Sequence, residues 1–147
     1  MGSEFMILSK KYACLFNEYG LSSDDVIHII VENHNHVFGA LGGMWIIGGI
    51  ISFADVTTDE KSLIQQLVKT KAKLVICDTS SFKTTMKAIA FCGDVKGKSI
   101  KVASFEDLDG IDNISKKLQT MRDTSVCAAA NIKNIEEDLC LIFWKQE

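Results

Sequence analysis

Glycines are concentrated in the segment from Val37 to Ala54, and glycine-rich segments are one common means of binding phosphate. Phosphate-binding glycines lie between a strand and the N-terminus of a helix, where backbone N–H groups face the ligand. Gly39, Gly42 and Gly43 instead fall inside a predicted helix. Their position favours close packing of this helix on a sheet over a phosphate loop. The motif G-x-x-x-x-G-K-[ST] does not occur in the chain.

Three histidines, His28, His34 and His36, lie close together in the sequence and invite a metal-site interpretation. Their spacing matches neither H-E-x-x-H nor a Cys/His zinc pattern. His28 falls within a predicted strand, and the other two fall in the turn after it, where doubly wound folds place ligands. The spacing favours a solvated turn that caps the following helix. We therefore assign no metal ligand.

The cysteines are five in number, and an odd count with no C-x-x-C pair fits a disulfide framework poorly. Most lie in apolar surroundings, where a thiol behaves as a small hydrophobic group. This pattern predicts an intracellular, reducing compartment, the cytoplasm or the peroxisome. Only one cysteine precedes a predicted helix, the position that could activate a thiolate. The cysteines are Cys14, Cys77, Cys92, Cys127 and Cys140.

Other polar groups provide no recognisable catalytic set. Acidic residues precede two predicted strands, at Asp24-Asp25 and Glu136-Glu137-Asp138, and solvated turn charges account for them. General acid–base catalysis would need carboxylates that converge on a cleft. Ser80-Ser81 and Thr84-Thr85 have no identifiable base partner for nucleophilic catalysis. The sequence predicts no catalytic, cofactor-binding or metal-binding residue.

Charge and hydropathy exclude two further classes of protein. A net charge of −3, with 16 basic residues scattered among 19 acidic ones, argues against a nucleic-acid surface. The uncharged run from Val37 to Ala54 approaches the roughly 17–25 residues of a membrane helix. Its character changes at Gly48-Gly49, so we interpret it as a helix followed by a buried strand and expect no membrane span.

Helical and strand patterns alternate along the chain. Helices are predicted for Ile7 to Tyr19 (ended by Gly20), for His36 to Ile47 (capped by Asn33), for a segment opening at Thr57 with a Thr57–Glu60 capping box, and for Ser80 to Phe91. Weaker helical material runs from Phe105 to Leu118, and Asp123 to Asn134 reads as a loop. Strands are predicted for Val26 to Val31, Ile50 to Phe53, Lys73 to Cys77, Ile100 to Ser104 and Leu139 to Trp144.

This alternation predicts an α/β fold: a doubly wound, mostly parallel sheet of about five strands flanked by helices. Residues 1–5, Met-Gly-Ser-Glu-Phe, read as a cloning scar ahead of Met6. Residues 6–147 are then expected to form a single α/β domain, since one domain commonly holds roughly 100–150 residues.

Several stretches, taken in order, resemble the adenylate-forming (AMP-binding) enzymes. Asp25 to Asn33 resembles their opening strand, and Gly39 to Ser52 their glycine-bearing helix and second strand. The stretches Thr57 to Leu67 and Lys71 to Ile76 are similar to the next helix and strand. Glu137 to Trp144 resembles the strand that leads into the family's phosphate-binding loop. The nearest branch contains 4-coumarate–CoA ligases, fatty acyl-CoA synthetases and beetle luciferases.

The resemblance covers nearly everything from Leu8 to Trp144, with two departures. Relatives usually have a proline near Phe53-Ala54-Asp55-Val56, and this chain contains none. The family's Ser/Thr/Gly-rich loop, its acyl pocket and its C-terminal domain lie downstream of the position of Trp144. The resemblance therefore implies a fragment or truncated relative that ends before the phosphate-binding loop, in which no family catalytic residue has a counterpart. ATP, Mg and coenzyme A are implied only for the parent enzyme.

Three hypotheses about function follow. The first is a non-catalytic fragment or truncated relative of an ATP-dependent carboxylic acid–CoA ligase, luciferase-like in type. The second is a truncated binding or regulatory module that self-associates through an exposed sheet edge or apolar face, or binds a small ligand without turnover. The third, ranked last, is a nucleotide binder that uses the turn from Glu32 to His36.

Overall fold

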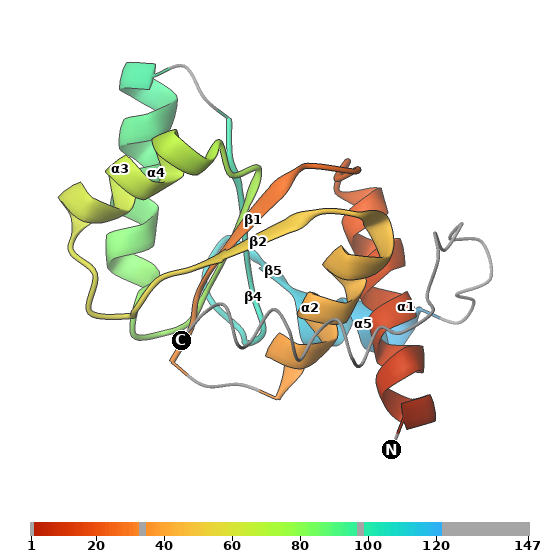
Figure 1. The fold of residues 1–147 in the computed structure, drawn as a ribbon. Coiled ribbons are helices and arrows are strands. Elements are labelled where there is room, and N and C mark those ends of the chain that lie inside the picture. Colours follow the sequence, from red (N-terminus) through yellow and green to blue (C-terminus); the bar gives the residue numbers. More distant parts are fainter. Residues whose placement is uncertain (1, 33–34, 97–98, 122–147) are drawn as a thin grey trace. The chain divides into compact units, whose positions relative to one another are not determined.

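A computed structural model describes residues 2–32, 35–96 and 99–121 of the chain. These residues belong to two compact units. Of the described residues, one unit contains 2–24, 35–50 and 118–121, and the other contains 25–32, 51–96 and 99–117. Figure 1 gives the order of the elements along the chain. The predictions for Asn33, His34, Asp123 to Asn134 and Leu139 to Trp144 lie outside the described residues.

The first unit contains the helices α1 (Gly2–Glu18) and α2 (His36–Ile47), which pack on each other. Helix α1 begins earlier than predicted and includes residues that the sequence analysis had excluded as a cloning scar. It ends as expected, since Gly20 adopts a left-handed conformation with φ of +84°. Helix α2 has the predicted bounds, and Asn35 occupies its N-cap position without a side-chain capping bond.

The glycines of α2 lie against α1, so the prediction that they pack on the sheet is wrong. A Cβ atom added to Gly43 would lie 2.5 Å from Tyr12 Cβ and 2.9 Å from the backbone nitrogen of Ala13. An added Cβ atom at Gly39 would similarly meet the side chains of Leu8 and Tyr12. The absence of side chains at these positions is what allows the two helices to approach so closely.

A five-stranded sheet has the order β2-β1-β3-β4-β5 in the described part of the chain. Its strands are β1 (Val26–Ile30), β2 (Ile50–Phe53), β3 (Leu74–Cys77), β4 (Lys101–Ser104) and β5 (Asp112–Asn113). The pairs β1–β3, β3–β4 and β4–β5 are parallel. The predicted doubly wound α/β class is confirmed, and four of the predicted strands are present with nearly the predicted bounds.

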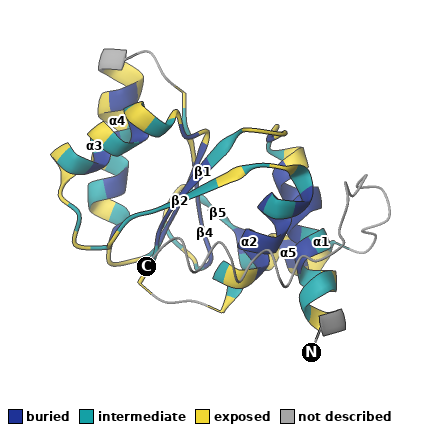
Figure 2. Cartoon of the chain, in the orientation of Figure 1, coloured by how far each residue is buried: buried dark blue, intermediate teal, exposed yellow. Residues whose placement is uncertain are grey.

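The second unit has a hydrophobic core between the sheet and the helices α3 (Glu60–Thr70) and α4 (Phe82–Lys96). In Figure 2 the buried residues, in dark blue, lie on the strands and on these helices. Because strand side chains alternate between faces, every second residue of β1, β3 and β4 points into this core. Its central members are Ile30, Leu63, Leu67, Val75, Cys77, Ala88, Cys92 and Val102.

Two local predictions are corrected in this unit. Helix α3 is capped by Asp59, whose carboxylate accepts a hydrogen bond from the backbone N–H of Ser62, and Thr57 instead bonds to Asp55. The weaker helical material predicted for Phe105 to Leu118, with an interruption at Gly110, is only partly present, because the region contains β5 and then the short helix α5 (Ile114–Thr120). Strand β5 has only two residues, too few for an alternating pattern to be visible in the sequence.

Candidate functional site

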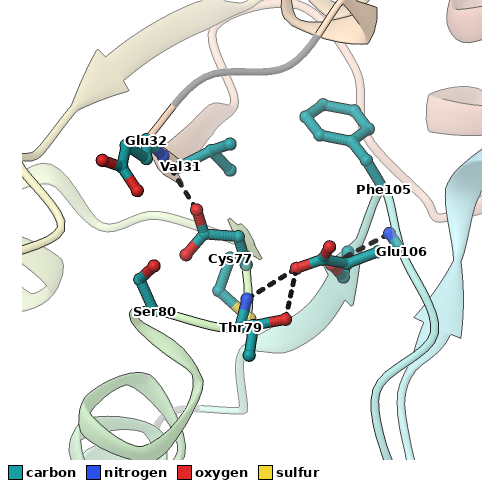
Figure 3. A pocket seen from close by; sticks show the side chains of 9 residues that line it. Val31, Glu32, Cys77, Thr79, Ser80, Phe105 and Glu106 are labelled. Atoms are coloured by element: carbon teal, nitrogen blue, oxygen red, sulfur yellow. Dashed lines mark hydrogen bonds between the residues drawn. The ribbon is translucent and has the colours of Figure 1, made fainter.

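A cavity of about 320 Å³ lies where β1, β3 and β4 end. The order of the sheet reverses between β1 and β3, because β2 lies on one side of β1 and β3 on the other. Doubly wound sheets bind their ligands at such a reversal, outside the carboxyl ends of the strands. Figure 3 shows this cavity from close by. Its lining residues are Val31, Glu32, Cys77, Asp78, Thr79, Ser80, Ser104, Phe105 and Glu106.

Asp78 organises the turn between β3 and α4. Its backbone N–H donates to Ser81 Oγ at 3.1 Å, and the backbone N–H of Ser81 donates to Asp78 Oδ1 at 3.0 Å. This reciprocal pair has the arrangement of a capping box and stabilises the start of α4. Asp78 Oδ2 also accepts a hydrogen bond of 2.9 Å from the backbone N–H of Glu32. One carboxylate therefore joins the segments that follow β1 and β3.

Ser81 strengthens the same connection from the helix side. Its hydroxyl donates to the carbonyl oxygen of Ile30 at 2.7 Å, and the side chain is almost completely buried. A buried hydroxyl needs such a partner, since its desolvation would otherwise be unfavourable. The serine that the sequence analysis considered as a nucleophile without a base is thus a structural link between β1 and α4.

Glu106 connects the segments that follow β3 and β4. Its Oε1 atom accepts hydrogen bonds from the backbone N–H of Thr79 at 2.6 Å and from the Thr79 hydroxyl at 2.7 Å. Its own backbone N–H donates to Ser104 Oγ at 3.2 Å. Figure 3 shows these bonds between Thr79 and Glu106 on one side of the cavity. The cavity walls are therefore fixed by side chain–backbone bonds rather than by the sheet alone.

Cys77 lies at the base of this cavity and is not an activated nucleophile. Burial raises the pKa of its thiol to about 12, and the negative charges of Asp78 and Glu106 act in the same direction. The thiol is therefore neutral at physiological pH, and nucleophilic catalysis needs the thiolate. The suggestion that its place before the third predicted helix could activate Cys77 is wrong.

The described cysteines differ in their oxidation state. Cys77 and Cys92 are buried thiols, as expected for cysteines that act as small hydrophobic groups. Cys14 in α1 is disulfide-bonded, which contradicts the expectation for that residue. The reducing compartment therefore stays a prediction.

The histidines do not form a metal site in the described residues. His28 is buried in β1, and its Nε2 atom lies 3.0 Å from Gln66 Oε1 on α3. His36 begins α2, and its Nδ1 atom lies 2.6 Å from the Tyr12 hydroxyl. No group of three His, Cys, Asp or Glu side chains among these residues could hold a metal ion. His28 lies within a strand, as predicted, and His36 lies at the first residue of α2.

The remaining candidate groups have local roles or lie outside the description. Asp25 forms a salt bridge of 3.1 Å with Lys73, between residues that adjoin β1 and β3. Thr85 is buried in α4, and its hydroxyl has no hydrogen-bond partner among the described residues. Glu136 to Asp138 lie outside the described residues. No helix in the described ranges is long and apolar enough to cross a membrane.

Sequence reasoning missed the residues that line this cavity, although the signal was present. The ends of the strands at Cys77 and Ser104 were predicted, and polar residues follow both of them. In doubly wound sheets, ligands bind beyond the carboxyl ends of the strands. Asp78 and Thr79 follow the predicted strand that ends at Cys77, and Glu106 follows the one that ends at Ser104, so their positions mark them as candidates.

Solved structures with the same fold include a luciferase, a luciferase-like enzyme and acyl-CoA synthetases. The chain is similar to the luciferase-like enzyme of the mealworm Zophobas morio, with a TM-score of 0.74 and 14% identity over 88% of this chain and 30% of that one. It is similar to a red-emitting luciferase from Phrixothrix hirtus, with a TM-score of 0.68 and 22% identity over 84% of this chain and 23% of that one. It is also similar to an acyl-CoA synthetase from Brucella canis, with a TM-score of 0.71 and 18% identity over 87% of this chain and 23% of that one.

The chain spans between 23% and 30% of the length of these three proteins. At such low identity the likeness establishes the fold, and it confirms the predicted resemblance at that level: the chain has the fold of the N-terminal portion of luciferase-like enzymes and acyl-CoA synthetases. No family model and no curated protein sequence matches the chain.

Proposed function

We propose that this chain is a part, without a complete catalytic site, of an ATP-dependent carboxylic acid–CoA ligase of the luciferase-like type. The observation that supports it is the shared fold, which extends over 84–88% of this chain in three such enzymes. The complete enzyme would join a carboxylic acid to AMP and then to coenzyme A, with ATP and magnesium as cofactors.

The chemistry of the described cavity supports a non-catalytic role for this part. Adenylation needs hydrogen-bond donors and a cation around the charge of the transferring phosphate. The backbone N–H groups of Glu32, Thr79 and Glu106 already donate to side chains of the protein, and the lining residues include three carboxylates. ATP phosphates do not fit such a cavity, and we derive no reaction step through ATP here.

ATP–pyrophosphate exchange is the direct test. We expect the purified chain to exchange no more label than a boiled sample in the presence of fatty and aromatic carboxylic acids. Exchange above that control would overturn the proposal. The proposal that the chain belongs to a longer adenylating enzyme is tested by sequencing the source transcript beyond the codon for Trp144. A Ser/Thr/Gly-rich loop that ends in lysine is expected there, and its absence would contradict the assignment to an adenylating parent.

A second candidate function is a module that self-associates with a second copy of the chain. It is favoured by an apolar groove of about 540 Å³ along α3 and α4, whose lining includes Ile64, Val68 and the exposed ring of Phe91. Its charged residues, Glu60, Lys61 and Lys69, have both signs, so the glutamate of one copy can pair with a lysine of the other. Large apolar patches commonly mark contact surfaces.

A further inference from the structure

The segments that follow β1, β3 and β4 use their backbone donors internally. The N–H groups of Glu32, Asp78, Thr79 and Glu106 donate to Asp78, Ser81, Glu106 and Ser104 respectively, at 2.6–3.2 Å. In nucleotide-binding folds the N–H groups at these positions face the phosphate instead. The cavity between these segments therefore has few donors left for an anion.

Hydrogen-bond acceptors, in contrast, remain available around the cavity. The carboxylate of Glu32 takes part in no hydrogen bond or salt bridge with the described residues. Glu106 accepts both of its bonds from Thr79 through Oε1, so Oε2 can accept a further donor. In the view of Figure 3, Glu32 and Glu106 stand on opposite sides of the turn after β3. Among the described residues, no lysine, arginine or histidine lines the cavity and neutralises these carboxylates.

The remaining wall of the cavity is apolar or neutral. Val31 and the buried ring of Phe105 line it, and Figure 3 shows this ring beside the backbone that leads to Glu106. The fully buried thiol of Cys77 also lines the cavity and remains protonated. An aromatic ring that lines the same cavity as carboxylates suits an organic cation, because the ring face attracts positive charge.

A metal ion fits this arrangement less well than an organic cation does. The described carboxylates do not converge into a group of three that could hold a metal ion, and Asp78 already accepts hydrogen bonds through both oxygens. Small-molecule sites commonly have volumes of about 300–1,000 Å³, and the cavity, at about 320 Å³, falls at the lower end of this range.

We propose that this cavity binds a small organic cation, an alkyl- or arylammonium ion. The carboxylates of Glu32 and Glu106 would accept hydrogen bonds from the ammonium group, and Val31 and Phe105 would contact its apolar part. The proposal does not depend on the catalytic status of the parent enzyme, because it concerns only residues of this chain.

Binding of 2-phenylethylammonium to the purified chain, measured by isothermal titration calorimetry at neutral pH, tests this proposal. Two matched probes, 3-phenylpropionate and 2-phenylethanol, keep the ring and replace the cation by an anion or a neutral hydroxyl. Magnesium chloride is the fourth probe. We expect saturable binding of the ammonium ion alone. Absence of that binding, equal binding of the phenylpropionate, or binding of magnesium in its place would overturn the proposal.

Two variants test whether the ammonium ion binds in this cavity. Glu32→Gln removes one negative charge from a side chain without partners in the described structure, and it should raise the Kd for the ammonium ion at least about tenfold. Glu106→Gln keeps an amide oxygen for Thr79 and should act in the same direction. Glu18→Gln, at an exposed position of α1 that lines neither the cavity nor the groove, is the matched control. Circular dichroism confirms that each variant is folded, and unchanged binding by folded Glu32→Gln and Glu106→Gln would contradict the site.

Discussion

Individual polar side chains in this protein are explained by their surroundings rather than by their type. His28 is buried in β1, contacts Gln66 and faces the side of the sheet that α3 covers. Ser81, which could have been a nucleophile, connects α4 to the carbonyl of Ile30. In both cases burial and hydrogen bonding assign a structural role to a residue type that is also common in active sites.

The buried histidine should make stability depend on pH. Burial lowers the pKa of His28, and the hydrogen bond that its Nε2 atom donates to Gln66 Oε1 opposes this only in part. Below about pH 6.5 the unfolded chain therefore binds a proton more readily than the folded chain. As the pH is lowered through this range, the free energy of unfolding should decrease, by at most about 1.4 kcal/mol per pH unit from this residue.

Urea unfolding at pH 7 and pH 5.5 measures this dependence. We expect His28→Gln, which has no titrating side chain, to show a smaller loss of stability between the two pH values than the wild type. His34→Gln is the control that removes a different histidine. Equal losses in the wild type and His28→Gln would show that His28 does not titrate in this way.

At the scale of helices and strands, close approach and capping decide the local structure. Helices α1 and α2 approach each other because Gly39 and Gly43 present no side chain to α1. Helix α3 starts at Glu60 because Asp59 accepts the N–H of Ser62. Both features depend on contacts that the hydrophobic pattern of the sequence does not specify.

Replacement of Gly43 by alanine should destabilise the protein. The added methyl group would overlap Tyr12 Cβ and the Ala13 backbone, neither of which is the end of a flexible side chain. Overpacking of this kind costs about 1–3 kcal/mol. The matched control is Gly93→Ala at an exposed position of α4, which should be stabilising by up to about 1 kcal/mol. Chemical denaturation compares the two, and a stabilised Gly43→Ala variant would contradict the close contact.

The N-cap of α3 can be tested by two alanine variants. Asp59→Ala removes the acceptor for the Ser62 N–H and should lower the midpoint of thermal unfolding. Thr57→Ala removes only a hydroxyl that donates to Asp55 on the surface, so its effect should be smaller. If Thr57→Ala proved the more destabilising, the capping box predicted from the sequence would be the better description. Differential scanning calorimetry decides between these outcomes.

At the scale of the whole molecule, the sheet order places one cavity at the reversal between β1 and β3 and leaves an apolar groove along α3 and α4. The fold is that of the N-terminal portion of much longer enzymes, of which it spans at most 30%. The likeness to those enzymes is a property of the fold as a whole, and the self-association that we propose belongs to the same scale.

Self-association should depend on the groove along α3 and α4. Phe91→Lys places a charge on its apolar surface and should shift the mass measured by light scattering at high protein concentration towards that of the monomer. Ala90→Lys adds the same charge at the neighbouring exposed position of α4, which does not line the groove, and should leave the mass unchanged. A wild-type protein that is monomeric at all concentrations would refute the self-association.

Much of the architecture was accessible from the sequence by itself. Short β-branched runs such as Val26 to Ile30 and Leu74 to Cys77 are typical of strands buried on both faces, and their alternation with helical periods predicted the doubly wound sheet. The carboxyl ends of those strands, and hence the place of a binding cavity, follow from the same pattern.

Only the tertiary structure determined which groups meet at that place. The pairing of Asp78 with the backbone of Glu32, 46 residues away, and of Glu106 with Thr79, 27 residues away, depends on strand order and register. Local periodicity carries no information on contacts between distant segments, which arise from long-range packing. For the same physical reason, the cavity's excess of acceptors and the contact of the α2 glycines with α1 could not be derived from residue types and spacing.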